Sequence, residues 1–378
     1  MAEDLLEKLK AIDFAVLTDI VRQDQNDLSF EISSWDVKHL SDKGIANPDG
    51  LWLFSGTGGH ETRPWSIVLK ILNRPSEEPT ADNVWHWKRE FSFVQSNLSK
   101  HLPGPVKAPR IYHTEETPAG CWIWMEYVQG IGSGPWTLDE YAFAAHQLGL
   151  WNGSYLTGTS LPTDNWLTWQ PYRSWLSGMD FDKDIQSPLH QKYLPKEILT
   201  RYKELSAERE TFFKALENLP QVFSHFDSQR RNLFIRSGKA GQKELVLLDW
   251  GQCGVGAIGA ELTWLIGLSV ALLEWSPLEI ARLDEITFPS YMRGLNESGW
   301  SGTAELVRLG FTSMFTAYIG CALPSLTGWW CDPEHSQFAL QQFNHIEEEL
   351  YLKWLPIFDH AIKYADEARI LMKKLSFP

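Results

Sequence analysis

Hydrophobic and polar positions divide the chain into a β-rich first part and a helical second part. Apolar residues recur at helical spacing from Asp4 to about Arg22, and β-forming residues dominate Glu31–Leu40. Apolar runs at Leu51–Phe54 and Trp65–Leu72 stand between segments rich in turn-forming residues, which predicts an antiparallel meander. The other elements predicted in this part are a helix over Asn83–Leu102 and strand-like segments at Tyr112 and Cys121–Val128.

Helical periodicity takes over beyond the glycine-containing stretch Gly130–Pro135, and a single β-flavoured segment, Val222–Asp249, interrupts it. We therefore predict an α+β fold with two lobes. A small β-rich N-lobe would span residues 1–129, and a larger, mostly α-helical C-lobe would span residues 130–378. The helices predicted in the second part are Thr137–Tyr155, Pro195–Leu216, Ala257–Leu273, Thr303–Leu323 and much of Ser336–Lys374.

Composition narrows the class of protein. The 378 residues are 43% hydrophobic and 22% charged, as is ordinary for a soluble globular protein, and the formal net charge is −14. An acidic surface disfavours nucleic acids and anionic membranes as partners. The four cysteines form no C-x-x-C pair, so neither a zinc site nor a disulfide framework is indicated, and we expect reduced thiols in a cytoplasmic protein.

The sequence predicts neither a signal peptide nor a membrane span. The N-terminus lacks the basic start and apolar run of a signal peptide. The most apolar stretches, around Leu262–Leu273 and Phe311–Leu323, are shorter than the ~20 residues that cross a bilayer, so we predict core helices. The 19 tryptophans admit two interpretations, a tryptophan-rich core and an aromatic substrate pocket.

Two polar motifs in the β-flavoured segment carry the candidate chemistry. His225, Asp227 and Asn232 form the pattern H-x-D-x-x-x-x-N, and the apolar run Val246–Leu248 ends at Asp249. Phosphoryl transfer needs a carboxylate that orients the accepting hydroxyl and takes its proton, and oxygen ligands for the Mg²⁺ that bridges nucleotide phosphates. Each residue alone has an ordinary structural explanation, and their combination at this spacing indicates catalysis.

This combination resembles the catalytic and metal-binding segments of aminoglycoside phosphotransferases and their choline-kinase-like relatives, which share the protein-kinase fold. The resemblance implies that Asp227 is the catalytic base, that Asn232 and Asp249 bind Mg²⁺, and that His225 organises the loop. Asp249 is followed by Trp250 rather than by Phe-Gly, and no Ala-Pro-Glu segment follows, which favours small-molecule over protein acceptors. Glu261, in the segment that opens the next helix, is expected to be structural.

The first part of the chain contains candidates for nucleotide binding. The family grips the α- and β-phosphates with a strand lysine held by a helix glutamate, and Lys70 and Glu90 have suitable positions. The alternatives are a solvated lysine on an edge strand and a glutamate on a solvated helix face. By resemblance, Gly44 and Asn47 would belong to a nucleotide-covering loop within Ser41–Gly50, for which a plain hairpin loop is the alternative.

Two further segments are interpreted through the resemblance. Ser55–Gly59 looks like a phosphate loop in composition but falls where the turn between the second and third strands is expected, and no G-x-x-x-x-G-K-[ST] motif exists. Trp124–Gly130 resembles the linker between the lobes, which implies adenine binding by backbone groups of Glu126 and Val128.

The catalytic loop departs from the family pattern at three positions. Phe226 stands where relatives often carry glycine. Arg230 and Arg231 are uncommon inside this loop, and they either meet phosphate or face solvent.

The resemblance implies an enzyme that transfers the γ-phosphoryl group of ATP or GTP, with Mg²⁺, to a hydroxyl of a small metabolite or antibiotic. Trp151, Trp166, Trp169 and Trp175 fall where relatives shape the acceptor pocket, and aromatic walls suit a choline-like cation, a sugar face or a macrocycle. The alternatives are a nucleotide-binding pseudokinase that acts as scaffold or sensor, and a protein kinase. The acceptor, the nucleotide, the oligomeric state and a metabolic or resistance role stay open.

Overall fold

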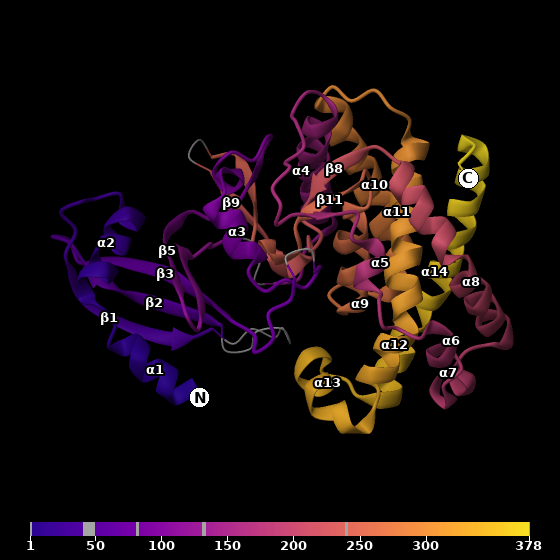
Figure 1. Ribbon diagram of the computed structural model, residues 1–378, viewed down its shortest axis with the longest axis horizontal. Helices are drawn as coiled ribbons and strands as arrows, with labels where there is room; N and C mark the ends of the chain where they lie inside the picture. The colour runs from indigo at the N-terminus through magenta and orange to yellow at the C-terminus, as the bar shows by residue number, and fades with distance from the viewer. Residues whose placement is uncertain (1, 41–49, 81–82, 131–133, 239–240, 378) are drawn as a thin grey trace. The chain divides into compact units, whose positions relative to one another are not determined.

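The computed structural model describes residues 2–40, 50–80, 83–130, 134–238 and 241–377, which form two compact units (Figure 1). The main division, between Gln129 and Gly130, coincides with the predicted lobe boundary. Two short segments before it, Ala81–Val84 and Leu102–Val106, nevertheless belong to unit 2. Unit 1 comprises the rest of residues 1–129, and unit 2 continues from Gly130 to Pro378.

Unit 1 contains a five-stranded antiparallel sheet with the order β1-β2-β3-β6-β5. Alternate residues of a strand point to opposite faces, and both faces of this sheet are covered. Ile67 and Leu69 of β3 enter one core with apolar residues of the N-terminal helices, whereas Val68 enters a second core with Phe91. The strands are β1 Ile32–His39, β2 Leu51–Gly58, β3 Arg63–Asn73, β5 Ile111–Thr117 and β6 Gly120–Glu126.

The helices of unit 1 are shorter than the sequence pattern predicts. The helix predicted from Asp4 to Arg22 is divided in two because Asp13 caps the second one, its carboxylate accepting from the Ala15 N–H at 2.8 Å. The helix predicted over Asn83–Leu102 is interrupted at Ser96, whose backbone is extended. The observed elements are α1 Ala2–Lys10, α2 Phe14–Gln25, α3 Arg89–Gln95 and the short η1 Asn97–Lys100.

Unit 2 is mostly helical, and α8, α11 and α14 pack alongside one another (Figure 1). Helix α4 begins with a capping box, in which Thr137 and Glu140 satisfy each other's backbone N–H groups. It packs closely on α10 at Gly149. A Cβ at this position would lie 2.1 Å from the Tyr291 carbonyl oxygen, so only glycine fits there. The α-helices are α4 Leu138–Leu156, α5 Tyr172–Trp175, α6 Phe181–Ile185, α7 Pro188–Tyr193, α8 Lys196–Asn218, α9 Ser269–Ala271, α10 Ile280–Glu297, α11 Ala304–Met314, α12 Cys321–Trp330, α13 Ser336–Phe343 and α14 Glu347–Leu375.

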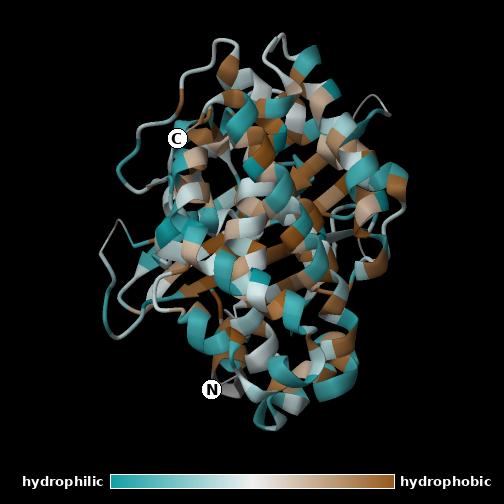
Figure 2. Ribbon diagram, turned by 90° about the vertical axis from the view of Figure 1, so that its right-hand side faces the viewer, coloured by the Kyte–Doolittle hydropathy of each residue, from teal (hydrophilic) through white to brown (hydrophobic). Residues whose placement is uncertain are grey.

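Short helical turns and two π-helices complete the helical part. In Figure 2 the helices show both teal and brown residues, as expected for helices with one buried side, while brown residues are frequent on the strands. The 3₁₀ turns are η2 Arg230–Asn232, η3 Trp250–Gln252, η5 Pro277–Glu279 and η7 Pro333–His335. The π-helices are η4 Thr263–Leu268 and η6 Phe315–Gly320.

Two three-stranded sheets hold the polar motifs. The first has the order β4-β10-β9, and the second has the order β7-β11-β8, with β11 parallel to β7 and antiparallel to β8. Strands β8, β9 and β10 lie in the predicted β-flavoured segment, whereas β4, β7 and β11 lie outside it. The strands are β4 Val106–Lys107, β7 Thr168–Trp169, β8 Gln221–Ser224, β9 Leu233–Ser237, β10 Lys243–Leu247 and β11 Gly254–Ala257.

The apolar stretch around Phe311–Leu323 lies in a longer helical run than the sequence pattern predicts. Helices α11, η6 and α12 join into one run, Ala304–Trp330, of 27 residues. By length and composition this is the one helical run in the described part of the chain that could cross a membrane, and 83% of its apolar window is buried inside the protein. That burial is what a core helix requires.

Candidate functional site

Asp227 lies in the loop that follows β8, and two amides hold its carboxylate. Asn232 Nδ2 donates to Asp227 Oδ2 at 2.7 Å and to the Asp227 carbonyl oxygen at 3.0 Å. Gln229 Nε2 donates to Asp227 Oδ1 at 2.8 Å. Asp227 is half-buried, so the carboxylate is fixed in orientation and still reachable from solvent. The role of Gln229 was not predicted, because a glutamine inside a loop carries no sequence signal of its own.

The backbone of Phe226 explains why glycine is common at this position in the resembling family. Its φ is +57°, in the left-handed region that side chains with a Cβ disfavour. The ring is 1% exposed and contacts Trp175 and Trp264, with ring centroids 5.0 and 5.2 Å apart. Burial of the ring therefore offsets the cost of the backbone conformation.

A buried carboxyl group, that of Glu261, hydrogen-bonds the backbone of the loop that contains Asp227. Glu261 is fully buried, and its Oε2 accepts from the His225 N–H at 3.1 Å. Burial raises the pKa of Glu261 to about 7, although hydrogen bonds, including the one from the His225 amide, oppose the rise. Glu261 thus has the structural position that the sequence indicates, and it adds a group that titrates near neutral pH.

The β9–β10 hairpin brings Asp249 next to the loop. Leu233 pairs with Leu247, and the Leu248 N–H donates to the Asn232 carbonyl oxygen at 2.8 Å, so Asn232 and Asp249 stand at neighbouring strand ends. Asp249 has a φ of +62°, a conformation that costs energy and is found at functional sites. The fully buried ring of His225 contacts Trp250 edge-on at 4.6 Å, which links the two motifs.

Asn232 and Asp249 fit an incomplete magnesium site. The Asn232 amide nitrogen is used by Asp227, which leaves its side-chain carbonyl oxygen as the donor atom for a cation, and Asp249 is exposed. Within the described residues, no group of three or more His, Cys, Asp or Glu side chains could hold a metal ion. Mg²⁺ usually keeps several waters and takes one or two carboxylates plus phosphate oxygens, so two protein oxygens are compatible with binding alongside a nucleotide.

Arg230 and Arg231 do not simply face solvent, and contact with phosphate stays a prediction. Arg230 Nη2 and Arg231 Nε both contact Glu274 Oε1, at 3.1 and 2.6 Å, and all three side chains are largely buried. Arg230 Nη1 also donates to the Gly134 carbonyl oxygen at 3.0 Å. The arginines anchor the loop of Asp227 to the segment after α9. Glu274 was missed because it lies more than 40 residues away in sequence.

In unit 1, Lys70 and Glu90 form an ion pair. Lys70 Nζ lies 2.5 Å from Glu90 Oε2, and their side chains are 12% and 6% exposed. The geometry follows from strand periodicity, because Lys70 is two residues from Val68 and shares its face, on which Phe91 of α3 packs. The alternatives of a solvated lysine and a solvated glutamate are therefore wrong.

The other nucleotide-binding candidates have different outcomes. Gly44 and Asn47 lie outside the described residues. Ser55–Gly59 is not the turn itself, because β2 continues to Gly58. Glu126 ends β6 opposite Ile67 of β3, with its carboxylate 3.4 Å from Arg110 Nε, and Val128 is buried two residues later. The adenine contacts assigned to Glu126 and Val128 stay predictions.

The tryptophans predicted to shape the acceptor pocket differ in burial, and their role in acceptor binding stays a prediction. Trp151 is fully buried and packs edge-on against Trp250 and Phe223, so it belongs to the core. Trp175 is 5% exposed, whereas Trp169 is 54% exposed. All four cysteines are buried free thiols.

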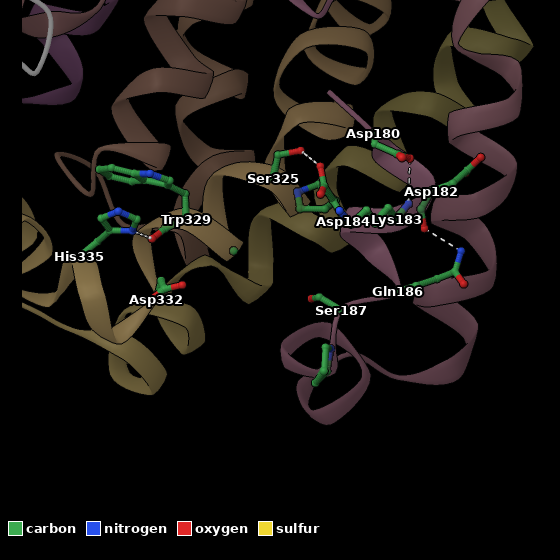
Figure 3. A pocket seen from close by; sticks show the side chains of 13 residues that line it. Asp180, Asp182, Lys183, Asp184, Gln186, Ser187, Ser325, Trp329, Asp332 and His335 are labelled. Atoms are coloured by element: carbon green, nitrogen blue, oxygen red, sulfur yellow. Dashed lines mark hydrogen bonds between the residues drawn. The ribbon is translucent and has the colours of Figure 1, made fainter. Parts of the chain in front are cut away.

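A groove of about 900 Å³ lies elsewhere in unit 2, and none of the predicted site residues lines it (Figure 3). One side is formed by Asp180–Pro188 and the other by α12 and η7. Figure 3 shows the Trp329 ring stacked on His335, with ring centroids 3.9 Å apart, and Ser325 bonded to Asp184 across the groove.

The fold and the two polar motifs together define a protein-kinase-like phosphotransferase. The phosphotransferase enzyme family (APH) matches residues 60–291, more than half of the chain, and the protein belongs to this family. None of the curated proteins matches the sequence.

Solved structures share the fold at low sequence identity. An aminoglycoside phosphotransferase from Alicyclobacillus acidocaldarius superposes with a TM-score of 0.52 and 11% identity, over 95% of this chain and 96% of that one. The GDP complex of an aminoglycoside 2'-phosphotransferase IIIa variant gives a TM-score of 0.50 and 12% identity, over 92% and 100%. At this identity the likeness establishes the protein-kinase-like fold, and the predicted fold class is confirmed.

Proposed function

We propose that this small-molecule phosphotransferase moves the γ-phosphoryl group of ATP or GTP to a hydroxyl group of its acceptor. The observation that carries the proposal is the carboxylate of Asp227, held by Asn232 and Gln229 beside the strand end that carries Asp249. A carboxylate with both oxygens fixed can direct one acceptor hydroxyl, and such positioning supplies much of the rate acceleration in phosphoryl transfer.

The residues divide the chemistry among them. The acceptor hydroxyl would donate its proton to Asp227 as its oxygen bonds to the γ-phosphorus, while the bond from phosphorus to the bridging oxygen breaks and the nucleoside diphosphate leaves. Asn232 and Asp249 would hold Mg²⁺, which supplies charge neutralisation for the phosphates. Lys70, oriented by Glu90, would bind the α- and β-phosphate oxygens.

The first test measures nucleotide consumption with Mg²⁺ by the wild type and by Asp227→Ala. The acceptor panel contains aminoglycosides, macrolides, choline, amino-alcohols and sugars. Loss of general-base catalysis is expected to lower acceptor-stimulated turnover about 10²- to 10⁴-fold. Asp332→Asn is the matched control, because Asp332 lines the groove of Figure 3 rather than the catalytic loop.

Three outcomes of this test distinguish the competing functions. Turnover that survives in Asp227→Ala contradicts the assignment of the base. Tight Mg·nucleotide binding with no turnover on any compound favours the scaffold or sensor, and phosphate on a protein favours a protein kinase.

A further inference from the structure

An aromatic cluster lies below the catalytic loop and connects both polar motifs. Phe226, which precedes Asp227, contacts Trp175 and Trp264. The indole Nε1 of Trp175 donates to Gln252 Oε1 at 3.3 Å, three residues beyond Asp249. A side-chain ring that packs against these residues is therefore held in a fixed position relative to the loop of Asp227.

Tyr318 is the member of this cluster that reaches solvent. Its ring lies 5.5 Å from Trp264 and 5.7 Å from Trp175, measured between centroids. Phe226, Trp175 and Trp264 are at most 5% exposed, whereas Tyr318 is half-buried. Among the residues that the structure describes, no group hydrogen-bonds the Tyr318 hydroxyl.

The backbone places Tyr318 by an uncommon device. Tyr318 stands in the π-helix η6 and Trp264 in the π-helix η4, and the two segments pack against each other. A π-helix inserts an extra residue into a turn and so turns the following side chains, and such insertions occur frequently at functional sites. Here the π-helices bring the rings of Tyr318 and Trp264 together, and Trp264 in turn contacts Phe226, the residue before Asp227.

The phenol of Tyr318 stays protonated at neutral pH. Burial, and in second place the charge of Asp227, raise the pKa of Tyr318. A protonated phenol can donate a hydrogen bond to an oxygen atom that a carboxylate binds from the other side.

We propose that Tyr318 binds the acceptor, donating a hydrogen bond to the oxygen of the hydroxyl group whose proton Asp227 accepts. Its ring provides a wall for the carbon atoms next to that hydroxyl, so the acceptor is an alcohol whose hydroxyl sits on an apolar or ring carbon. The phenol keeps its proton throughout, and the bonds that form and break are those of the proposed transfer reaction. The inference rests on that proposed function.

Tyr318→Phe tests the inference because it keeps the ring and removes the hydroxyl. For each panel compound that is phosphorylated, we expect kcat/KM to fall about tenfold for the acceptor, since one hydrogen bond is lost, while the KM for nucleotide stays unchanged. Tyr193→Phe is the matched control, because Tyr193 is also half-buried and lies in α7. A structural role alone would lower the melting temperature without changing acceptor and nucleotide constants differently.

A binding measurement keeps the test independent of turnover. Protein containing 3-fluorotyrosine gives one ¹⁹F resonance that is missing from Tyr318→Phe, and the panel compounds are added one by one with Mg²⁺ and a non-hydrolysable nucleotide. A shift of this resonance by a phosphorylated compound supports the inference. An unchanged resonance with every compound, or a wild-type kcat/KM in Tyr318→Phe, overturns it. Failure of the proposed function is separate, because it shows as turnover that survives in Asp227→Ala.

Discussion

Strain and packing oppose each other at Phe226. A left-handed backbone costs a residue with a Cβ about 1–2 kcal/mol, whereas loss of a buried phenylalanine ring costs about 3–5 kcal/mol. The ring is 1% exposed and packs on Trp175 and Trp264, so packing decides the balance. This position keeps phenylalanine because the aromatic cluster needs its ring.

The energies of backbone strain and ring packing can be separated by a pair of substitutions at Phe226. Phe226→Ala loses the ring and keeps the strain, whereas Phe226→Gly loses the ring and relieves the strain. We expect both to lower the free energy of unfolding measured in urea, with Gly less destabilising than Ala by about 1 kcal/mol. An alanine variant as stable as the glycine variant would show that the φ of +57° carries no cost.

Glu261 gives the stability of the protein a pH dependence. Its pKa is raised to about 7 in the folded state, so between pH 4.5 and 7 the folded state binds more protons than the unfolded state. The free energy of unfolding therefore falls as pH rises through this window, by roughly 3 kcal/mol in total for this group. The loss is complete above the folded pKa.

Glu261→Gln should remove this dependence, because the amide is neutral throughout and its oxygen can still accept from the His225 N–H. We expect the difference in unfolding free energy between variant and wild type to move in favour of the variant as pH rises from 4.5 to 7. Urea titrations at four pH values measure it. A difference that is constant with pH would mean that Glu261 does not titrate in this range.

At the scale of elements, the ion pair of Lys70 and Glu90 joins β3 to α3. Its side chains are nearly buried, and removal of one partner of such a pair costs about 3–5 kcal/mol because it leaves a buried charge uncompensated. Replacement of both partners by apolar residues is often neutral. Stability thus depends on both partners, whereas the proposed phosphate contact depends on Lys70 alone.

We expect Lys70→Met and Glu90→Met each to destabilise unit 1, and the double variant to be closer to the wild type than the sum of the two. Nucleotide affinity, measured by calorimetry with Mg·ATP and Mg·GTP, should be lost in Lys70→Met and stay lost in the double variant. Recovery of nucleotide binding in the double variant would contradict the assigned role of Lys70.

Local patterns predict elements well where the determinants are local. The period-2 pattern of β3 fixes both the strand and the face of Lys70, and the loop from Asp227 to Asn232 is closed by hydrogen bonds between residues at most five apart. Helix α10 was not predicted, and it contains Pro289, a residue that usually ends a helix. The π-helices that direct Trp264 and Tyr318 were also missed, because tertiary packing rather than local propensity sets them.

At the scale of the whole molecule, the two compact units are not continuous stretches of sequence. The change from a β-rich to a helical pattern near Gly130 is visible in the sequence. Val84 and Val106 come before this change, yet both are buried and belong to unit 2. Sequence reasoning assigns such short segments to the neighbouring lobe, because four or five residues carry too little pattern to indicate a partner far along the chain.

This discontinuity predicts how the chain responds to truncation. A fragment of residues 130–378 lacks Val84 and β4, and β4 pairs with β10, the hairpin strand that leads to Asp249. We expect the fragment to unfold at a lower urea concentration than unit 2 of the full chain, and tryptophan fluorescence monitors the unfolding. The matched control begins at Ala81 and retains all segments of unit 2, together with the intervening residues of unit 1. If the shorter fragment unfolded at the same midpoint as the full chain, the two early segments would contribute nothing to unit 2, and the unit would be continuous in its energetics.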